Sequence, residues 1–262
     1  MKTKANGITM NYQIKGKGSN LVLVHGAGDN LKMWYNQVPV FSRSYRVITY
    51  DVRGSGKTEN PQGRYSVSLL AEDAYQLMKA VGAQEAYFVG YSMGGRIATQ
   101  LALNYPELVK ALVFASSSPD LTPPPPEASE RLRSTLDLLD KGDMRAFAEA
   151  MTRDAFSPGF ESFHPTEFNE YLKVKLQNKA DGTARIMRLG QPRSSPDLSK
   201  IKCPVLLLVG ESDWVMGLEQ GKKAHEAIHG SKLVVLPTGH AAPIEAPDGF
   251  NAAVLEFLNE VR

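Results

Sequence analysis

The stretch "VGYSMGG", residues 89–95, joins a short apolar run to a segment with helical spacing. The run that it ends, "AYFVG", has the composition of a buried strand, and apolar side chains recur every three to four positions after Met93. Glycines at positions 90 and 94 have no side chain to collide where the chain turns sharply. We therefore expect Ser92 to stand at a turn from strand to helix, exposed above the strand end.

Short apolar runs like this one recur along the chain. They cover residues 8–14, 20–26, 45–51, 86–92, 111–117, 204–210 and 232–238. Most are apolar nearly throughout, as strands covered on both faces are, whereas 8–14 alternates with polar residues and is predicted to be an edge strand. Segments with helical spacing lie at 66–83, 93–109, 217–230 and 247–262. This alternation predicts an α/β fold with a mostly parallel sheet and helices on both faces.

The alternation stops between residues 118 and 196. Four consecutive prolines, 123–126, stand near its start and cannot continue a strand or a helix. Helical segments follow at 128–142, 143–156, 166–180 and 182–190, without a strand pattern. We expect a helical lid over residues 118–196, inserted between the two parts of an α/β core domain, 1–117 and 197–262.

Composition limits the partners of the protein. The 262 residues, 42% hydrophobic and 22% charged, are enough to bury a substantial core. A formal net charge of +2, with basic and acidic residues interspersed, argues against nucleic acid or an anionic membrane as the main partner. No run approaches the roughly 18 apolar residues of a membrane span, and no signal peptide is evident. One cysteine, Cys203, excludes an internal disulfide. We expect a soluble, cytoplasmic protein that binds a small-molecule substrate.

The string "GSGKT", residues 54–58, ends like a phosphate-binding P-loop and raises the hypothesis of a nucleotide site. The first glycine of that motif is missing, because Asp51 and Val52 occupy the positions where it would fall. A P-loop also continues directly into a helix, whereas "ENPQG" follows here. We predict a structural loop in which glycines allow tight turns and Asp51 and Arg53 form local pairs.

A strand followed by G-x-S-x-G and a helix is the arrangement of a nucleophile elbow, with Ser92 as the nucleophile. An ordinary glycine-rich turn is the alternative. A serine hydroxyl needs a general base and a group that orients the base. His240 is the candidate base, because it follows the last predicted strand and precedes the final helix. The other histidines are expected at structural or surface positions: His25, His164, His225 and His229.

Asp213 is the preferred acid of the site. It follows another predicted strand and lies deep enough in its loop to reach the loop of His240. Glu211, two residues earlier, and Asp120, after a different strand, stay open as alternatives. The chain order Ser92, Asp213, His240 is the one expected for a nucleophile elbow of this kind.

Together these residues resemble the α/β-hydrolase family. The resemblance rests on "GYSMGG" around Ser92, "HG" at 25–26, "DVRGSG" from 51, Asp213 and "GH" at 239–240, and it spans nearly the whole chain outside the insert. It implies a serine esterase of the carboxylesterase type with the triad Ser92, Asp213 and His240. It further implies that the N–H groups of Ala27 and Met93 form an oxyanion hole and that the insert is a cap over the active site. No metal or cofactor is expected.

The expected reaction is hydrolysis of carboxylic esters or lactones of small, largely apolar substrates through an acyl-enzyme on Ser92. Apolar side chains of the insert are expected either to line an apolar pocket or to pack the cap helices on one another: Leu132, Leu136, Leu139, Phe147, Met151, Phe156, Phe160, Phe163 and Met187. Three arginines are candidates for pairing with a substrate carboxylate: Arg185, Arg188 and Arg193.

The resemblance also leaves alternatives open. Carbon-carbon bond hydrolases have a similar "SMGG" run but usually carry Asn before the serine and Trp after the histidine, where this chain has Tyr91 and Ala241. Cofactor-free haloperoxidases or perhydrolases would use the same triad. Dehalogenases and epoxide hydrolases need an aspartate nucleophile, so Ser92 counts against them. A slow-turnover ligand receptor with a closing lid is the alternative outside the enzymes.

Overall fold

The computed structural model describes residues 1–117, 119, 126–189 and 196–262, with the backbone alone at 126–128. Within this part of the chain, one sheet has the strand order β1-β2-β4-β3-β5-β6-β7-β8. Its strands are β1 (Lys2–Ala5), β2 (Ile8–Lys15), β3 (Asn20–Val24), β4 (Arg46–Tyr50), β5 (Ala86–Tyr91), β6 (Val109–Ala115), β7 (Val205–Gly210) and β8 (Lys232–Leu236). The pairs β1–β2 and β2–β4 are antiparallel and the others parallel, which confirms the predicted fold class.

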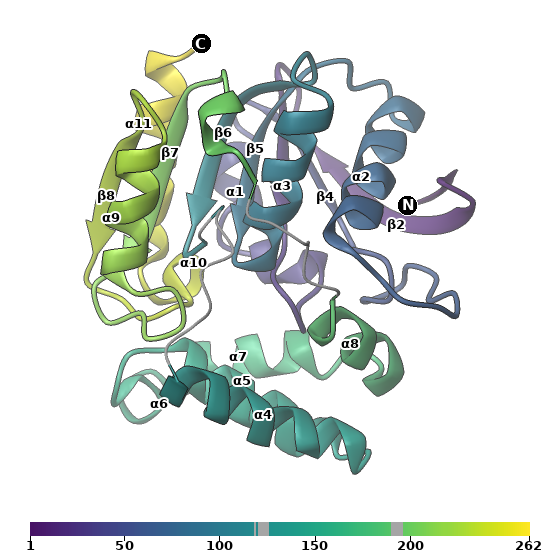
Figure 1. The fold of residues 1–262 in the computed structure, drawn as a ribbon, viewed down its shortest axis with the longest axis vertical. Coiled ribbons are helices and arrows are strands. Elements are labelled where there is room, and N and C mark those ends of the chain that lie inside the picture. The colour runs from purple at the N-terminus through teal and green to yellow at the C-terminus, as the bar shows by residue number, and fades with distance from the viewer. Residues whose placement is uncertain (118, 120–125, 190–195) are drawn as a thin grey trace.

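Helices cover both faces of the sheet (Figure 1). On one face pack α2 (Val67–Ala80), α3 (Met93–Asn104) and α9 (Leu218–Ala227), and on the other η1 (Leu31–Trp34), α1 (Val38–Phe41), α10 (Ala242–Glu245) and α11 (Pro247–Glu260). Neighbouring residues of one strand belong to different layers: Phe88 packs with the first group of helices and Val89 with the second. This double burial explains why the strand sequences are apolar nearly throughout.

The predicted helical insert lies between β6 and β7. It contains α4 (Pro126–Asp140), α5 (Met144–Ala155), α6 (Phe160–Phe163), α7 (Pro165–Lys175) and α8 (Ala180–Met187). These helices form a layer across the end of the sheet toward which β6 and β8 point (Figure 1). The limits predicted for it, 118 and 196, fall at or beside residues outside the described part, so the domain boundaries stay a prediction. Among the described helices, none has the length and apolar character to span a bilayer.

The expectation that residues 8–14 form an edge strand is wrong, because β1 pairs with β2 and takes the edge. In the register Ala5 faces Ile8, which leaves a two-residue turn. The turn residues Asn6 and Gly7 have φ angles of 48° and 76°, as a type I′ hairpin turn requires. The sequence did not predict β1 because "KTKA" is mostly polar, although the Asn6-Gly7 pair that follows it is a hairpin signal.

Residues 51–65, all of which are described, form a loop without a helix, as predicted for the "GSGKT" string. The carboxylate of Asp51 accepts three hydrogen bonds at 2.8 Å, one of them from the N–H of Lys57. The N–H of Lys57, which a P-loop would offer to a phosphate, is thus bonded to the carboxylate of Asp51. Arg53 forms a buried ion pair, 2.5 Å long, with Asp73 of α2.

Candidate active site

Ser92 lies between β5 and α3 in a strained backbone conformation, with φ of 50° and ψ of −118°. Close approach of other segments requires the glycines around it. A Cβ atom at Gly90 would lie 2.5 Å from the Cα of Gly95, and one at Gly94 would lie 2.2 Å from the carbonyl oxygen of Val24. The hydroxyl of Ser92 does not cap its own helix. The two glycines therefore permit a sharp turn between β5 and α3, and this turn leaves the Ser92 side chain above the sheet.

Three side chains from separate loops form one hydrogen-bonded chain at the carboxyl ends of β5, β7 and β8. The Oγ atom of Ser92 lies 3.0 Å from Nε2 of His240, and Nδ1 of His240 donates to Oδ2 of Asp213 at 2.9 Å. The carboxylate therefore favours the tautomer that leaves the Nε2 lone pair facing the serine hydroxyl. The side chains of His240 and Asp213 are only 9% and 0% exposed.

The loop after β7 holds Asp213 in place through its backbone. Oδ1 of Asp213 accepts the N–H groups of Val215 at 2.9 Å and of Met216 at 2.8 Å. Glu211, the alternative acid two residues earlier, is exposed, and the hydrogen bond to the imidazole belongs to Asp213. The other alternative, Asp120, lies outside the described residues.

His25 has the structural position that the sequence suggested. Its Nδ1 donates to the carbonyl oxygen of Gly26 at 2.8 Å, and its Nε2 accepts the N–H of Val52 at 2.9 Å. Burial is the largest cause that lowers the pKa of this imidazole, and it outweighs the nearby Asp51 and Asp29 carboxylates. The neutral ring thus joins the loops that follow β3 and β4.

The two residues expected to form an oxyanion hole lie on adjacent segments. Met93 is the first residue of α3, where a helix leaves N–H groups without intrahelical partners. Ala27 lies in a turn closed by a hydrogen bond from the Asp29 N–H to the Gly26 carbonyl, 3.3 Å long. Gly28 has φ of 76°, which the third position of a type II turn requires. The role of Ala27 and Met93 toward an oxyanion stays a prediction.

Sequence reasoning missed Glu245, which joins the loop of His240 to the cap. Its carboxylate accepts the N–H of Gly239 at 2.9 Å, and also the N–H and the hydroxyl of Ser157, which lies between α5 and α6. The N–H of Ala241 donates to the carbonyl oxygen of Ala155 at 2.6 Å. Both neighbours of His240 are thus bonded to the cap or to Glu245. No spacing motif marks Glu245, because its partners come from segments far apart in the chain.

The apolar cap residues have three kinds of position. The rings of Phe156 and Phe160 stack at 4.1 Å and belong to the packed interior. Phe163, on the single turn of α6, is 82% exposed and so lies outside the packed interior of the cap. Phe147 is fully buried, and its ring lies 3.7 Å from the place of a Cβ atom on Gly28, next to Ala27. Phe147 therefore borders the turn that carries Ala27.

Two of the arginines proposed to bind a substrate carboxylate have partners in the protein. Arg185 donates to the side chain of Gln62 and to the carbonyl oxygen of Gly63, and Arg188 pairs with Asp140. Arg193 lies outside the described residues. The contacts of these two arginines are exposed and involve neither Ser92 nor His240, so they offer no support for a role at Ser92.

Known proteins resemble this chain over nearly its full length. It is 29% identical over 253 residues to 3-oxoadipate enol-lactonase 2 of Acinetobacter baylyi, which covers 95% of this chain and 93% of the relative. The enol-lactonase of Burkholderia xenovorans LB400 superposes with a TM-score of 0.89 at 26% identity, covering 99% of this chain and 100% of the other. A thermophilic esterase from Thermogutta terrifontis superposes with a TM-score of 0.88 at 27% identity, covering 100% of this chain and 99% of the esterase.

The family itself is shown by a match to more than half of the chain. Residues 20–184 fit the model of the alpha/beta hydrolase fold family, a span that runs from β3 through the elbow and into α8. The order of the strands and the helical insert after β6 agree with this match. The resemblance read from the sequence is thereby confirmed: this chain belongs to the α/β-hydrolase fold family.

Proposed function

We propose that the protein is a serine hydrolase that cleaves carboxylic esters or lactones of small, largely apolar substrates through an acyl-enzyme on Ser92. The observation that carries this proposal is the unbroken chain from Ser92 through His240 to Asp213, with links of 3.0 and 2.9 Å. An enol-lactonase and an esterase among the similar proteins support the two substrate classes.

In the first step Ser92 attacks the carbonyl carbon of the substrate. Nε2 of His240 takes the proton from Oγ while the new C–O bond forms, and the carbonyl electron pair moves onto oxygen. The N–H groups of Ala27 and Met93 would hold that oxyanion. Because backbone donors of a packed turn and a helix start are already oriented, they need no rearrangement as charge develops. Asp213 stabilises the imidazolium through Nδ1–H.

In the second step the tetrahedral intermediate collapses and the bond to the leaving oxygen breaks. His240 gives its proton to that oxygen, which departs as an alcohol from an ester or stays attached as a hydroxyl after a lactone opens. His240 then takes a proton from water, whose oxygen attacks the acyl group. The acid is released and Ser92 regains its proton.

The preference for apolar substrates rests on the side chains that border the proposed oxyanion hole. The Phe147 ring lies against Gly28, beside Ala27. Met93 follows the nucleophile and is 6% exposed. Apolar walls with a few fixed polar groups are typical of sites for small ligands.

The test is a panel of nitrophenyl esters and lactones with the wild type and Ser92→Ala. The variant should lose about 10⁴-fold or more in kcat, because the members of a triad act as a unit, and its melting temperature should change little. Ser116→Ala is a matched control, since Ser116 also has positive φ, at 46°, and is fully buried. A fluorophosphonate should label Ser92. A label on a different serine, or esterase activity in Ser92→Ala, would remove Ser92 from this role.

The nitrophenyl esters of this panel, together with two further assays, separate the alternatives. Release of one equivalent of nitrophenol followed by a stall would favour the slow-turnover receptor, because an enzyme continues to cycle. Turnover only with vinylogous diketones would favour a carbon-carbon bond hydrolase. Peracid formation from an ester and hydrogen peroxide, faster than hydrolysis, would favour a perhydrolase.

A further inference from the structure

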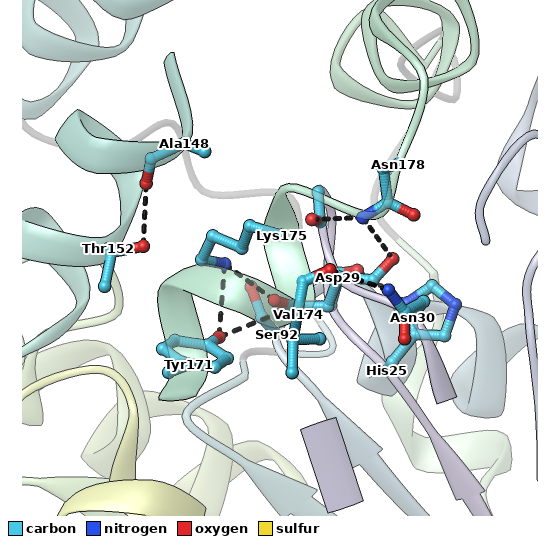
Figure 2. A network of polar contacts seen from close by, with 12 residues as sticks. His25, Asp29, Asn30, Ser92, Ala148, Thr152, Tyr171, Val174, Lys175 and Asn178 are labelled. Atoms are coloured by element: carbon cyan, nitrogen blue, oxygen red, sulfur yellow. Dashed lines mark hydrogen bonds and ion pairs between the residues drawn. The ribbon is translucent and has the colours of Figure 1, made fainter. Parts of the chain in front are cut away.

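A buried polar network joins cap helix α7 to the turn that carries Ala27 (Figure 2). Lys175, the last residue of α7, pairs with Asp29 through Nζ and Oδ1 at 2.6 Å. The hydroxyl of Tyr171 donates to Oδ2 of Asp29 at 3.1 Å and accepts from Nζ of Lys175 at 3.2 Å. The side chains of Lys175 and Asp29 are only 2% and 1% exposed. This ion pair is therefore shielded from water, unlike the surface pairs of the cap.

Backbone groups of the same turn are bonded to the residues that follow α7. Nδ2 of Asn178 donates to the carbonyl oxygens of Gly28 at 2.7 Å and of Asp29 at 3.2 Å. Its Oδ1 accepts the N–H of Gly56 at 2.7 Å, which fixes the amide orientation. The residue after the turn, Asn30, donates to the carbonyl oxygen of Val174 on α7 at 2.8 Å. The cap thus holds the turn from its third residue onward.

The ion pair also affects the charge close to Ala27. A Cβ atom on Gly26 would lie 3.0 Å from Oδ2 of Asp29, so this carboxylate folds back over the turn. An unpaired carboxylate there would oppose negative charge on a substrate oxygen at the Ala27 N–H. Lys175 cancels that charge, and loss of Lys175 would leave the carboxylate buried and unpaired.

We propose that Lys175 and Asn178 are positioning residues for the oxyanion hole. From the cap, they hold the turn that presents the Ala27 N–H to the reacting carbonyl, and Lys175 neutralises Asp29. The proposal rests on the proposed function of Ser92. It follows that the hole is complete only when α7 is docked on the core, so the cap contributes to the rate of turnover as well as to substrate fit.

The test compares kcat and KM on a nitrophenyl ester for wild type, Lys175→Met, Asn178→Ala and the double variant Asp29→Asn with Lys175→Met. Loss of one oxyanion donor costs about 10²–10³-fold in kcat, so we expect about 30-fold for Lys175→Met and about tenfold for Asn178→Ala, with KM within threefold. The double variant should recover part of the loss, because it removes the unpaired charge although the bond between α7 and the turn stays broken. Lys173→Met is the control, since Lys173 also lies on α7 but pairs with Glu170 at the surface.

Two measurements separate positioning from loss of folded protein. Rates are expressed per serine labelled at completion by a fluorophosphonate. Affinity for a trifluoromethyl ketone, whose adduct on serine carries an oxyanion, should fall in parallel with kcat/KM.

Four outcomes overturn the proposal. The first is an unchanged kcat per labelled site in Lys175→Met, and the second is a change in KM alone. The third is a double variant no faster than Lys175→Met. If Lys175→Met does not fold, a wild-type kcat in Asn178→Ala is the fourth. Absence of label on Ser92 in the wild type would instead contradict the proposed function itself.

Discussion

Asp213→Asn should lower kcat about 10⁴-fold and leave the protein folded. Oδ1 of Asp213 accepts two backbone N–H groups, of Val215 and Met216, while Oδ2 accepts Nδ1–H of His240. An amide has one acceptor oxygen, and the two backbone donors keep it. Its NH₂ group then faces Nδ1 of His240, which has to accept. The imidazole proton moves to Nε2, and Ser92 loses its base.

The magnitude follows from the cost of turning that amide around. The reverse orientation would restore the imidazole tautomer but would leave two buried N–H donors unsatisfied, at about 1–3 kcal/mol each. The unproductive tautomer is therefore favoured by several kcal/mol. A loss of about 10⁴-fold in rate corresponds to about 5 kcal/mol in the activation free energy. Because the two backbone bonds survive, the melting temperature should stay within about 6 °C of the wild type.

The assay is steady-state hydrolysis of a nitrophenyl ester, with thermal melts of each variant. Glu211→Gln is the matched control, because Glu211 lies two residues earlier, is exposed and does not bond the imidazole. We expect its kcat within twofold of the wild type. An Asp213→Asn rate above about a tenth of the wild type would refute the tautomer argument. A larger loss in Glu211→Gln than in Asp213→Asn would reassign the acid.

Three further predictions concern the surroundings of the triad. Gly94→Ala should lower the free energy of unfolding in urea by about 3 kcal/mol or more, because its Cβ atom would lie 2.2 Å from the carbonyl oxygen of Val24. Glu245→Gln should lower kcat about fivefold without changing KM, because its amide oxygen keeps the bonds from the N–H groups of Gly239 and Ser157 but lacks the negative charge that strengthens them. The His25 ring should titrate below pH 6.5 in NMR spectra, since burial lowers its pKa. The unfolded state then binds the proton first, so the free energy of unfolding falls as pH drops below 6.5.

Each of these has a contradicting result. Gly249→Ala is the control for Gly94→Ala. Gly249 lies inside α11 and its Cβ atom would lie 3.5 Å from the Leu236 side chain, an ordinary contact, so the variant should be neutral or stabilise by up to about 1 kcal/mol. Equal stability of the two variants would contradict the close packing at the elbow. For Glu245→Gln, a rise in KM at constant kcat would point to substrate binding instead. A His25 signal that titrates above pH 6.5 would contradict its neutral role.

The fold and the three loops of the candidate site could be predicted because their signals are local. A glycine-flanked serine after an apolar run marks the elbow, and the carboxyl ends of parallel strands necessarily share one edge of a sheet. The choice between Glu211 and Asp213 could not be made securely in this way. It depends on which carboxylate the backbone N–H groups of Val215 and Met216 enclose, and spacing does not report that.

Residues whose role depends on contacts between distant segments could not be predicted from local sequence patterns. Lys175 is one of several lysines in a helical segment, and its burial beside Asp29 depends on how α7 docks. Phe163 shows the opposite error. Its apolar side chain suggested the interior of the cap, but the short α6 turns it outward. Secondary-structure propensity and hydrophobic periodicity predict whether a segment is a helix or a strand, but they do not predict which segment it packs against.

The bonds of Glu245 to Ser157 and Gly239 have a consequence for evolution and for engineering. A cap transplanted from a relative would bring its own counterpart of Ser157 to a glutamate selected for a different partner, and the histidine loop would lose a support even if the graft folded well. Recombination between members of this fold should therefore succeed most often when α10 is exchanged along with the insert, so that Glu245 and its partner Ser157 come from the same parent.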